Sequence, residues 1–168
     1  FGRGGEEALA LRDHGLDVQV VSTGLRPPED DRFTQTLREV QRSAIYLNDP
    51  SLRQIGSIGA RLLSPSVRST MRWMMGLPHR TLPKRGRAAA AVLVAAHFAP
   101  ELARRDIRYV HSQFAGFQTE IAMSLSKLLG IPYGCTWHAY GIYRDRNILA
   151  EKIAGARTVM TCTKYNED

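Results

Sequence analysis

The segment 107–162 decides the fold of this chain, because three short apolar runs alternate in it with two helical ones. The apolar runs are IRYVH at 107–111, YGCTW at 133–137 and TVMTC at 158–162. The residues between them, 119–129 and 147–154, have helical composition, and Gly130 ends the first of these helices. Such alternation with short connections predicts parallel strands joined by right-handed crossovers. We therefore expect an α/β fold with a doubly wound, Rossmann-like parallel sheet and helices on both of its faces.

The preceding half of the chain contains weaker signals of the same kind. The elements expected there are a helix at 6–14, a strand at 17–22, a helix around 33–40, a strand at 44–47, helices within 51–76, a linker at 77–87 and an alanine-rich helix at 88–105. At 168 residues the chain has the length of about one domain. No internal repeat is present.

Composition and cysteine usage point to a globular intracellular protein. Apolar residues make up 43% of the chain and charged residues 23%, which excludes wholesale disorder. Cys135 and Cys162 have neither a CxxC partner nor a nearby histidine pair, so neither a zinc site nor a disulfide framework is expected. The longest apolar stretch, 88–98, is too short to span a bilayer, and no signal peptide opens the chain. We expect a cytoplasmic protein.

The net charge of +7 is concentrated in the middle of the chain. No acidic residue occurs between 50 and 100, where the basic residues are Arg53, Arg61, Arg68, Arg72, Arg80, Lys84, Arg85 and Arg87. Val67, Met71 and Met74 recur there at helical spacing, which indicates a short amphipathic helix. This helix either faces the core with solvated arginines or lies on an anionic membrane surface. Nucleic acid is not expected as a partner, since no binding motif accompanies the charge.

Polar side chains come at the ends of the three regular strands. His111 ends 107–111, His138 follows 133–137 and Thr163 follows 158–162. Parallel α/β sheets bind ligands beyond the carboxyl ends of their strands, so we expect these side chains at one rim. An imidazole can donate a hydrogen bond to a phosphate or a sugar hydroxyl. Taken alone, a histidine at a strand end is more often a polar cap or a hydrogen-bonded residue at the edge of the core than a catalytic group.

Two other patterns bear on chemistry. The opening FGRGGEE resembles a phosphate-binding turn before a helix, formed by Gly4 and Gly5. No strand precedes these glycines, so the dinucleotide fingerprint is incomplete and an ordinary chain end is the alternative. Asp145 and Glu151 are not placed as a general acid and base pair, which disfavours a self-contained hydrolase.

The segments IRYVHSQF, LLGIPYGCTWHAYGIY and ILAEKIAGARTVMTCTKYN occur in an order and spacing that carry a resemblance. Together they resemble the amino-terminal half of a family 4 glycosyltransferase, the retaining GT-B group. Within it they look closest to bacterial enzymes that build exopolysaccharide or other cell-surface glycans. The resemblance covers 107–166, is fainter over 6–28 and is poor through the basic middle.

The resemblance implies an enzyme of two Rossmann-like domains, with the acceptor held by the amino-terminal domain and the nucleotide sugar by the carboxyl-terminal one. Residues 1–168 would be the amino-terminal domain alone, truncated at both ends and inactive by itself, with 50–87 as a variable basic insertion and linker. The implied substrates are a nucleotide sugar and a glycan or lipid-linked acceptor, with no metal or other cofactor. The implied location is the cytoplasmic face of the membrane.

Carried over by position, His138 matches the histidine of the family's T-x-H-A strand end, which orients the donor and stabilises charge on the leaving diphosphate. His111 matches the first histidine of the H-x-H-F pattern, and Gln113 replaces the second. Thr163 matches the family's strand-end hydroxyl, but Lys164 stands where an acid is usual.

Tyr140 and Gly141 occupy positions that are commonly a lysine and an aspartate, which is compatible with a different acceptor, a diverged member or a degraded one. Phe114, Tyr140 and Tyr143 are candidates for stacking on a sugar ring, although aromatics beside a buried strand more often serve packing. Two other functional classes stay open. One is a non-catalytic, flavodoxin-like module that binds a nucleotide or a partner, with a basic membrane-facing surface. The other is a scaffold whose basic middle attaches to a membrane or to nucleic acid.

Overall fold

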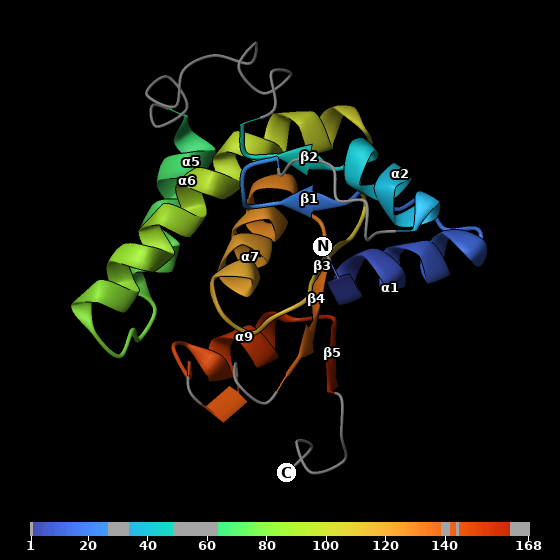
Figure 1. Ribbon diagram of the computed structural model, residues 1–168. Helices are drawn as coiled ribbons and strands as arrows, with labels where there is room; N and C mark the ends of the chain where they lie inside the picture. Colours follow the sequence, from blue (N-terminus) through green and yellow to red (C-terminus); the bar gives the residue numbers. More distant parts are fainter. Residues whose placement is uncertain (1, 27–33, 49–63, 139–141, 144, 162–168) are drawn as a thin grey trace. The chain divides into compact units, whose positions relative to one another are not determined.

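The computed structural model describes residues 2–26, 34–48, 64–138, 142–143 and 145–161 (Figure 1). Contacts divide the chain into two compact units, Phe1–Gln54 and Ile55–Asp168, and each is described here by itself. Both units combine helices with strands that pair in parallel, so the expected mixed α/β class is confirmed. The expectation of a single domain over 1–168 stays a prediction.

The described residues of the first unit, 2–26 and 34–48, contain two helices and two short strands. They are α1 (Gly2–Asp13), β1 (Val21–Ser22), α2 (Gln35–Ser43) and β2 (Ile45–Tyr46), and β1 pairs with β2 in parallel. Helix α2 begins after Thr34, whose hydroxyl accepts a hydrogen bond from the Leu37 amide at 3.3 Å. Val40 and Tyr46 are fully buried and form the centre of this unit together with Ala8.

The second unit carries the regular alternation of helices and strands. Its elements are α5 (Pro65–Gly76), α6 (Leu82–Arg104), β3 (Val110–Ser112), α7 (Phe117–Leu129), β4 (Tyr133–Trp137), α9 (Leu149–Gly155) and β5 (Thr158–Thr161). The strands form a three-stranded parallel sheet in the order β3, β4, β5, with a helix in each connection. The parallel pairing and the alternation expected over 107–162 are therefore confirmed, although β3 begins at Val110 rather than at Ile107.

One face of this sheet is buried beneath α7, which contacts both β3 and β4. Tyr133, Cys135 and Trp137 are buried at alternate positions of β4, as the pleat of a strand requires for side chains on one face. Gly130 ends α7 in the left-handed conformation, with φ of 69°, and turns the chain directly into β4.

Helices α5, α6 and α7 contact one another and hold the main apolar core of the unit. Its buried members are Val67, Met74, Ala88, Val92, Ala96, Ala122, Met123, Tyr133 and Ile148. Ala88, Ala91 and Ala95 of α6 are fully buried, and their small side chains let the neighbouring helices approach closely.

The linker expected at 77–87 is wrong in its second half, because α6 already begins at Leu82. Thr81 caps this helix by accepting a hydrogen bond from the Lys84 amide at 3.3 Å. Pro83 lies in the first turn, where its missing N–H costs no hydrogen bond, so this proline is compatible with the helix rather than a break in it. Lys84 and Arg87 are consequently helical residues. The helices expected within 51–63 lie outside the described residues.

Gly134 of β4 has no room for a side chain. A Cβ there would lie 2.9 Å from the carbonyl oxygen of Thr158 and would collide with the Tyr109 hydroxyl. We expect Gly134→Ala to lower the free energy of unfolding by about 1–3 kcal/mol, measured by urea denaturation. The matched control is Gly86→Ala in α6, where a Cβ has no neighbour within 4 Å. That variant should raise the free energy of unfolding by up to about 1 kcal/mol. Equal effects of the two substitutions would contradict the conclusion that Gly134 has no room for a side chain.

Candidate functional site

His138 lies directly after β4 and is half-buried. Its ring centroid is 5.4 Å from that of Phe114, and the two ring planes are tilted by 43°. Phe114 belongs to the loop after β3, the strand that pairs with β4, and 51% of its surface is exposed. An imidazole and an accessible aromatic ring thus meet at the carboxyl ends of two adjacent parallel strands.

His111 lies near the carboxyl end of β3, and its place at a common rim with His138 stays a prediction. It lies inside β3, level with Gly134 of β4, and its Nε2 is 2.9 Å from the Thr136 hydroxyl. His138 comes four residues after Gly134, which corresponds to about 13 Å along a strand at about 3.3 Å per residue. The ring of His111 lies alongside that of Tyr109, with centroids 6.5 Å apart. The His111 backbone thus lies farther back than that of His138, but its ring reaches Thr136, which is two residues before His138.

The remaining expected site residues fall into two groups. Tyr140 and Thr163 lie outside the described residues, as do Gly141 and Lys164. Gly4 and Gly5 belong to the first unit, and the loop expected there is wrong, since helix α1 already begins at Gly2 and includes both glycines. Whether any of these residues binds a substrate stays a prediction.

The loop after β3 is held by hydrogen bonds to three consecutive carbonyl groups. The Thr119 hydroxyl donates to the carbonyl of Phe114 at 2.6 Å, and the Lys152 ammonium donates to that of Ala115 at 2.7 Å. The Glu120 amide donates to the carbonyl of Gly116 at 3.3 Å. With its backbone fixed in this way, the loop holds Phe114 in a defined position beside His138.

Glu120, in the first turn of α7, is a fully buried carboxylate that sequence reasoning missed. Its Oε1 accepts hydrogen bonds from Arg87 at 2.7 Å, Asn147 at 3.1 Å and Lys152 at 3.2 Å. Its Oε2 accepts a second bond from the Arg87 Nε at 3.2 Å. Glu120 is the single acidic residue of α7 and precedes the apolar Ile121, Ala122 and Met123, which was the available signal, because a buried charge requires a partner.

Asp145 lies at the outer side of the same group of charges. It accepts a hydrogen bond from the Lys84 ammonium at 2.7 Å and another from the Arg87 guanidinium. Burial by itself raises the pKa of Asp145, but the hydrogen bonds from Arg87 and Lys84 outweigh this effect and lower the pKa to about 2. Burial lowers the pKa of Arg87, but its hydrogen bonds to Glu120 and to Asp145 outweigh this effect and raise the pKa. We refer to Lys84, Arg87, Glu120, Asp145, Asn147 and Lys152 as the ion cluster.

Lys152 of α9 is the buried cation of the ion cluster, with no exposed side-chain surface. Burial lowers the pKa of its ammonium, and the neighbouring Glu120 carboxylate opposes this shift. Sequence analysis placed Arg87 in a linker and gave Lys152 no role, so neither was recognised as a partner of Glu120.

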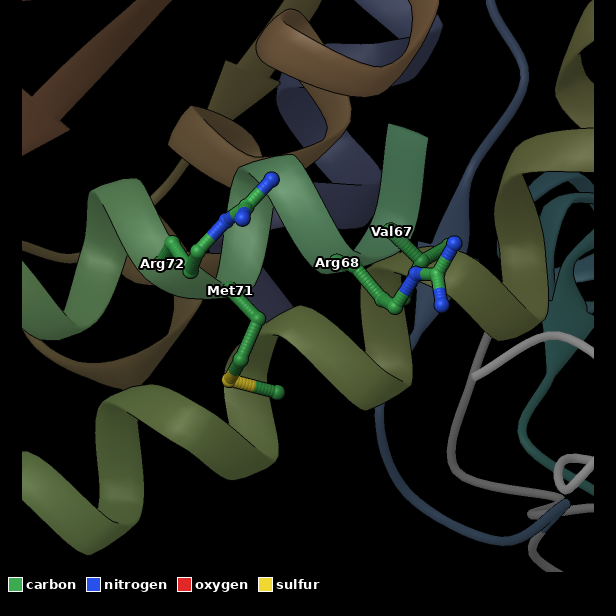
Figure 2. A pocket seen from close by; sticks show the side chains of 4 residues that line it. All are labelled: Val67, Arg68, Met71 and Arg72. Atoms are coloured by element: carbon green, nitrogen blue, oxygen red, sulfur yellow. The ribbon is translucent and has the colours of Figure 1, made fainter. Parts of the chain in front are cut away.

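A groove with a volume of about 270 Å³ lies along helix α5 (Figure 2). The groove is lined by Val67, Arg68, Met71 and Arg72, all from this one helix. Val67 and Met74 are buried in the core and Met71 packs against it, while Arg68 and Arg72 are exposed. The expected core-facing amphipathic helix is thus confirmed. A second cavity of about 270 Å³ is lined by Trp73, Met123, Ser126, Lys127, Tyr133, Glu151 and Gly155.

Within the ranges that the structure describes, no helix has the length and apolar character needed to cross a membrane. Among the same residues, no three histidine, cysteine or acidic side chains gather as potential metal ligands. Comparison with protein-family models, with curated proteins and with solved structures finds no match to this chain. The class of protein is defined by the structure itself, which is mixed α/β with short parallel sheets.

The lowered pKa of Asp145 predicts an acid-sensitive contribution to stability. Since the folded-state value of about 2 lies below the ordinary 3.8, this contribution is fully present above about pH 4 and is lost as the pH falls through about 2. We expect Asp145→Asn to lower the free energy of unfolding at pH 5 and to have a progressively smaller effect toward pH 2. Urea denaturation at a series of pH values measures this difference.

The control for this pH series is Asp106→Asn. Asp106 pairs with Arg108, and their side chains are 79% and 84% exposed. Its φ of 52° is a conformation that asparagine tolerates well. We expect little pH-dependent loss in this variant, and an effect of Asp145→Asn that is independent of pH would contradict the role given to its charge.

Proposed function

We propose that this chain is the acceptor-binding half of a retaining glycosyltransferase of the GT-B class. In this proposal the enzyme moves a sugar from a nucleotide sugar to a glycan or a lipid-linked acceptor. The observation that carries the proposal is the meeting of His138 with Phe114 at the carboxyl ends of β4 and β3. This is the edge of a parallel α/β sheet where ligands bind. The resemblance over 107–166 suggests the reaction class.

The two side chains suit the two parts of such a substrate. An imidazole at His138 can donate a hydrogen bond to a diphosphate, and so stabilise the charge that develops when the bond to the sugar breaks. Phe114 offers an exposed apolar ring on which the carbon-bound hydrogens of a sugar can lie. The fixed loop after β3 keeps these groups together without reorganisation on binding, which is the condition for electrostatic catalysis.

The proposal includes a larger assembly than the described elements. The three-stranded sheet and the two-stranded sheet would belong to one Rossmann-like domain, and a second such domain would hold the nucleotide sugar opposite His138. The acceptor would be of the cell-surface glycan type, and neither a metal nor another cofactor would be needed.

The decisive variant is His138→Ala in the complete protein that contains this chain and its donor-binding domain. We expect turnover with a nucleotide sugar to fall by about 10²–10³-fold, the usual loss when one preorganised donor to the transition state is removed. Transfer is measured as release of the nucleoside diphosphate, and circular dichroism verifies that the fold survives.

His97→Ala serves as the matched control, since His97 is a half-buried histidine of α6 in the same unit. It should leave turnover close to that of the unaltered protein. Unchanged turnover in His138→Ala would overturn the proposal. Tight nucleotide binding by the chain alone, without transfer in the complete protein, would instead support the non-catalytic binding module.

We propose further that helix α5 attaches the protein to an anionic membrane surface. Arg68 and Arg72 are exposed beside an apolar groove, and no acidic residue occurs in the described part of the chain from 64 to 100. Exposed cationic side chains without neighbouring acids are attracted to the anionic headgroups of a bilayer. This attachment would bring the site close to a lipid-linked acceptor.

Vesicles that contain phosphatidylglycerol test this attachment by co-sedimentation at increasing salt. Arg68→Gln combined with Arg72→Gln should weaken binding about 30-fold, from about 1 kcal/mol for each basic side chain at the surface. Arg104→Gln with Arg108→Gln is the control, because these exposed arginines are already paired with Glu101 and Asp106. Binding that does not weaken with salt would count against the proposal.

A further inference from the structure

The ion cluster connects the two loops that carry the candidate site. Arg87 of α6 holds Glu120 of α7 with two hydrogen bonds, and its remaining terminal nitrogen bonds to Asp145 in the segment after β4. A guanidinium is planar and presents its donors in a fixed fork, so it can bond to two carboxylates at once in one geometry. The ammonium of a lysine has no such fixed geometry.

The segment after β4 is tied to the site at its other end as well. The Ile142 amide donates to the carbonyl of His138 at 3.4 Å, and Ile142 packs against the cluster of Ala115, Cys135 and Trp137. Asp145 follows shortly afterwards and is anchored by Arg87 and Lys84. The described residues of this segment are therefore held at two points, at Ile142 beside the His138 carbonyl and at Asp145 beside Arg87.

The loop after β3 depends on the same carboxylate through a second cation. Lys152 donates to Glu120 and to the carbonyl of Ala115, which is the residue next to Phe114. A Cβ on Gly116 would lie 3.6 Å from the Asp145 carboxylate, so the two loops also run close together. The cations that hold the two loops, Arg87 and Lys152, thus both bond to the buried Glu120 carboxylate.

We propose that Arg87, bridging Asp145 and Glu120, is a positioning residue that sets His138 against Phe114. This inference rests on the proposed function, in which these two rings contact the substrate. Arg87 touches neither ring and is not itself a catalytic residue. Its part is to hold Asp145, which follows β4, in a fixed position relative to Glu120 of α7.

The charges of the ion cluster allow this role to be separated from stability. Two carboxylates, Glu120 and Asp145, meet three cations, Lys84, Arg87 and Lys152. Asp145→Asn removes the charge and one acceptor oxygen at the outer end of the bridge, while the buried Glu120 keeps both Arg87 and Lys152 as partners. No buried carboxylate is left without a cation, so the variant is expected to fold.

The test is the chemical shift of the His138 imidazole protons in the full chain, observed by nuclear magnetic resonance. Phe114→Leu gives the reference position without the aromatic ring, because a ring at 5.4 Å shifts neighbouring protons through its ring current. We expect the His138 signal in Asp145→Asn to move most of the way to that reference. Arg87→Lys, which keeps the charge but loses the fork, should move it in the same direction.

Asp106→Asn is the matched control and should leave the His138 signal in place, since its exposed ion pair lies outside the ion cluster. An unmoved His138 signal in a folded Asp145→Asn or Arg87→Lys variant would overturn the inference. Loss of the fold in both variants would overturn it too, because the bridge would then serve stability rather than position.

Kinetics separate this inference from the proposed function. In the complete protein, Asp145→Asn should lower kcat by about tenfold to a hundredfold, as expected for a misplaced reacting group, with a much smaller change in KM. A shifted His138 signal together with unchanged turnover in His138→Ala would leave the bridge established and the glycosyltransferase proposal wrong. A shifted signal with unchanged kcat in Asp145→Asn would overturn the positioning role in catalysis.

Discussion

The buried carboxylate of Glu120 is the constraint around which the second unit is organised. Taking an ionised carboxylate out of water costs several kcal/mol unless cations and hydrogen bonds replace its hydration. Here the replacements come from three different parts of the chain, namely α6 through Arg87, the segment after β4 through Asn147 and α9 through Lys152. The charge is compensated only when these parts are assembled, so the folded arrangement and the compensation depend on each other.

This dependence complements the apolar core. Burial of Val92, Ala96 and Met123 stabilises the packing of the helices, but the hydrophobic effect is non-directional and leaves a helix free to slide or turn by small amounts. Hydrogen bonds from a guanidinium fork fix direction as well as distance. The fully buried alanines of α6 let this helix lie close to its neighbours, which brings Arg87 within reach of Glu120.

The same arrangement gives the candidate site its character. A loop that follows a parallel strand is ordinarily a variable segment, yet the loop after β3 has three consecutive carbonyls bonded to side-chain or backbone donors. A preorganised edge of this kind suits electrostatic stabilisation of a leaving group better than a mobile loop does. The two rings that meet there differ in accessibility, because Phe114 is exposed and His138 is partly buried. Phe114 can therefore contact an apolar surface of a ligand, and His138 can donate a hydrogen bond to a charged group.

The sequence by itself determined the alternation of 107–162, because strand and helix periodicities and the stop at Gly130 are local properties of the chain. It also determined that His138 follows a strand, since YGCTW forms β4 with the bounds expected. Only the tertiary structure decided which side chains stand beside that histidine. The register of β3 against β4 places His111 beside Gly134 and its ring at Thr136, and hydrogen bonds between residues distant in sequence, such as Arg87 with Glu120 and Asp145, form the ion cluster. The sequence around a charged residue does not indicate its partner, because the same residue can be solvated or can pair with a group many positions away.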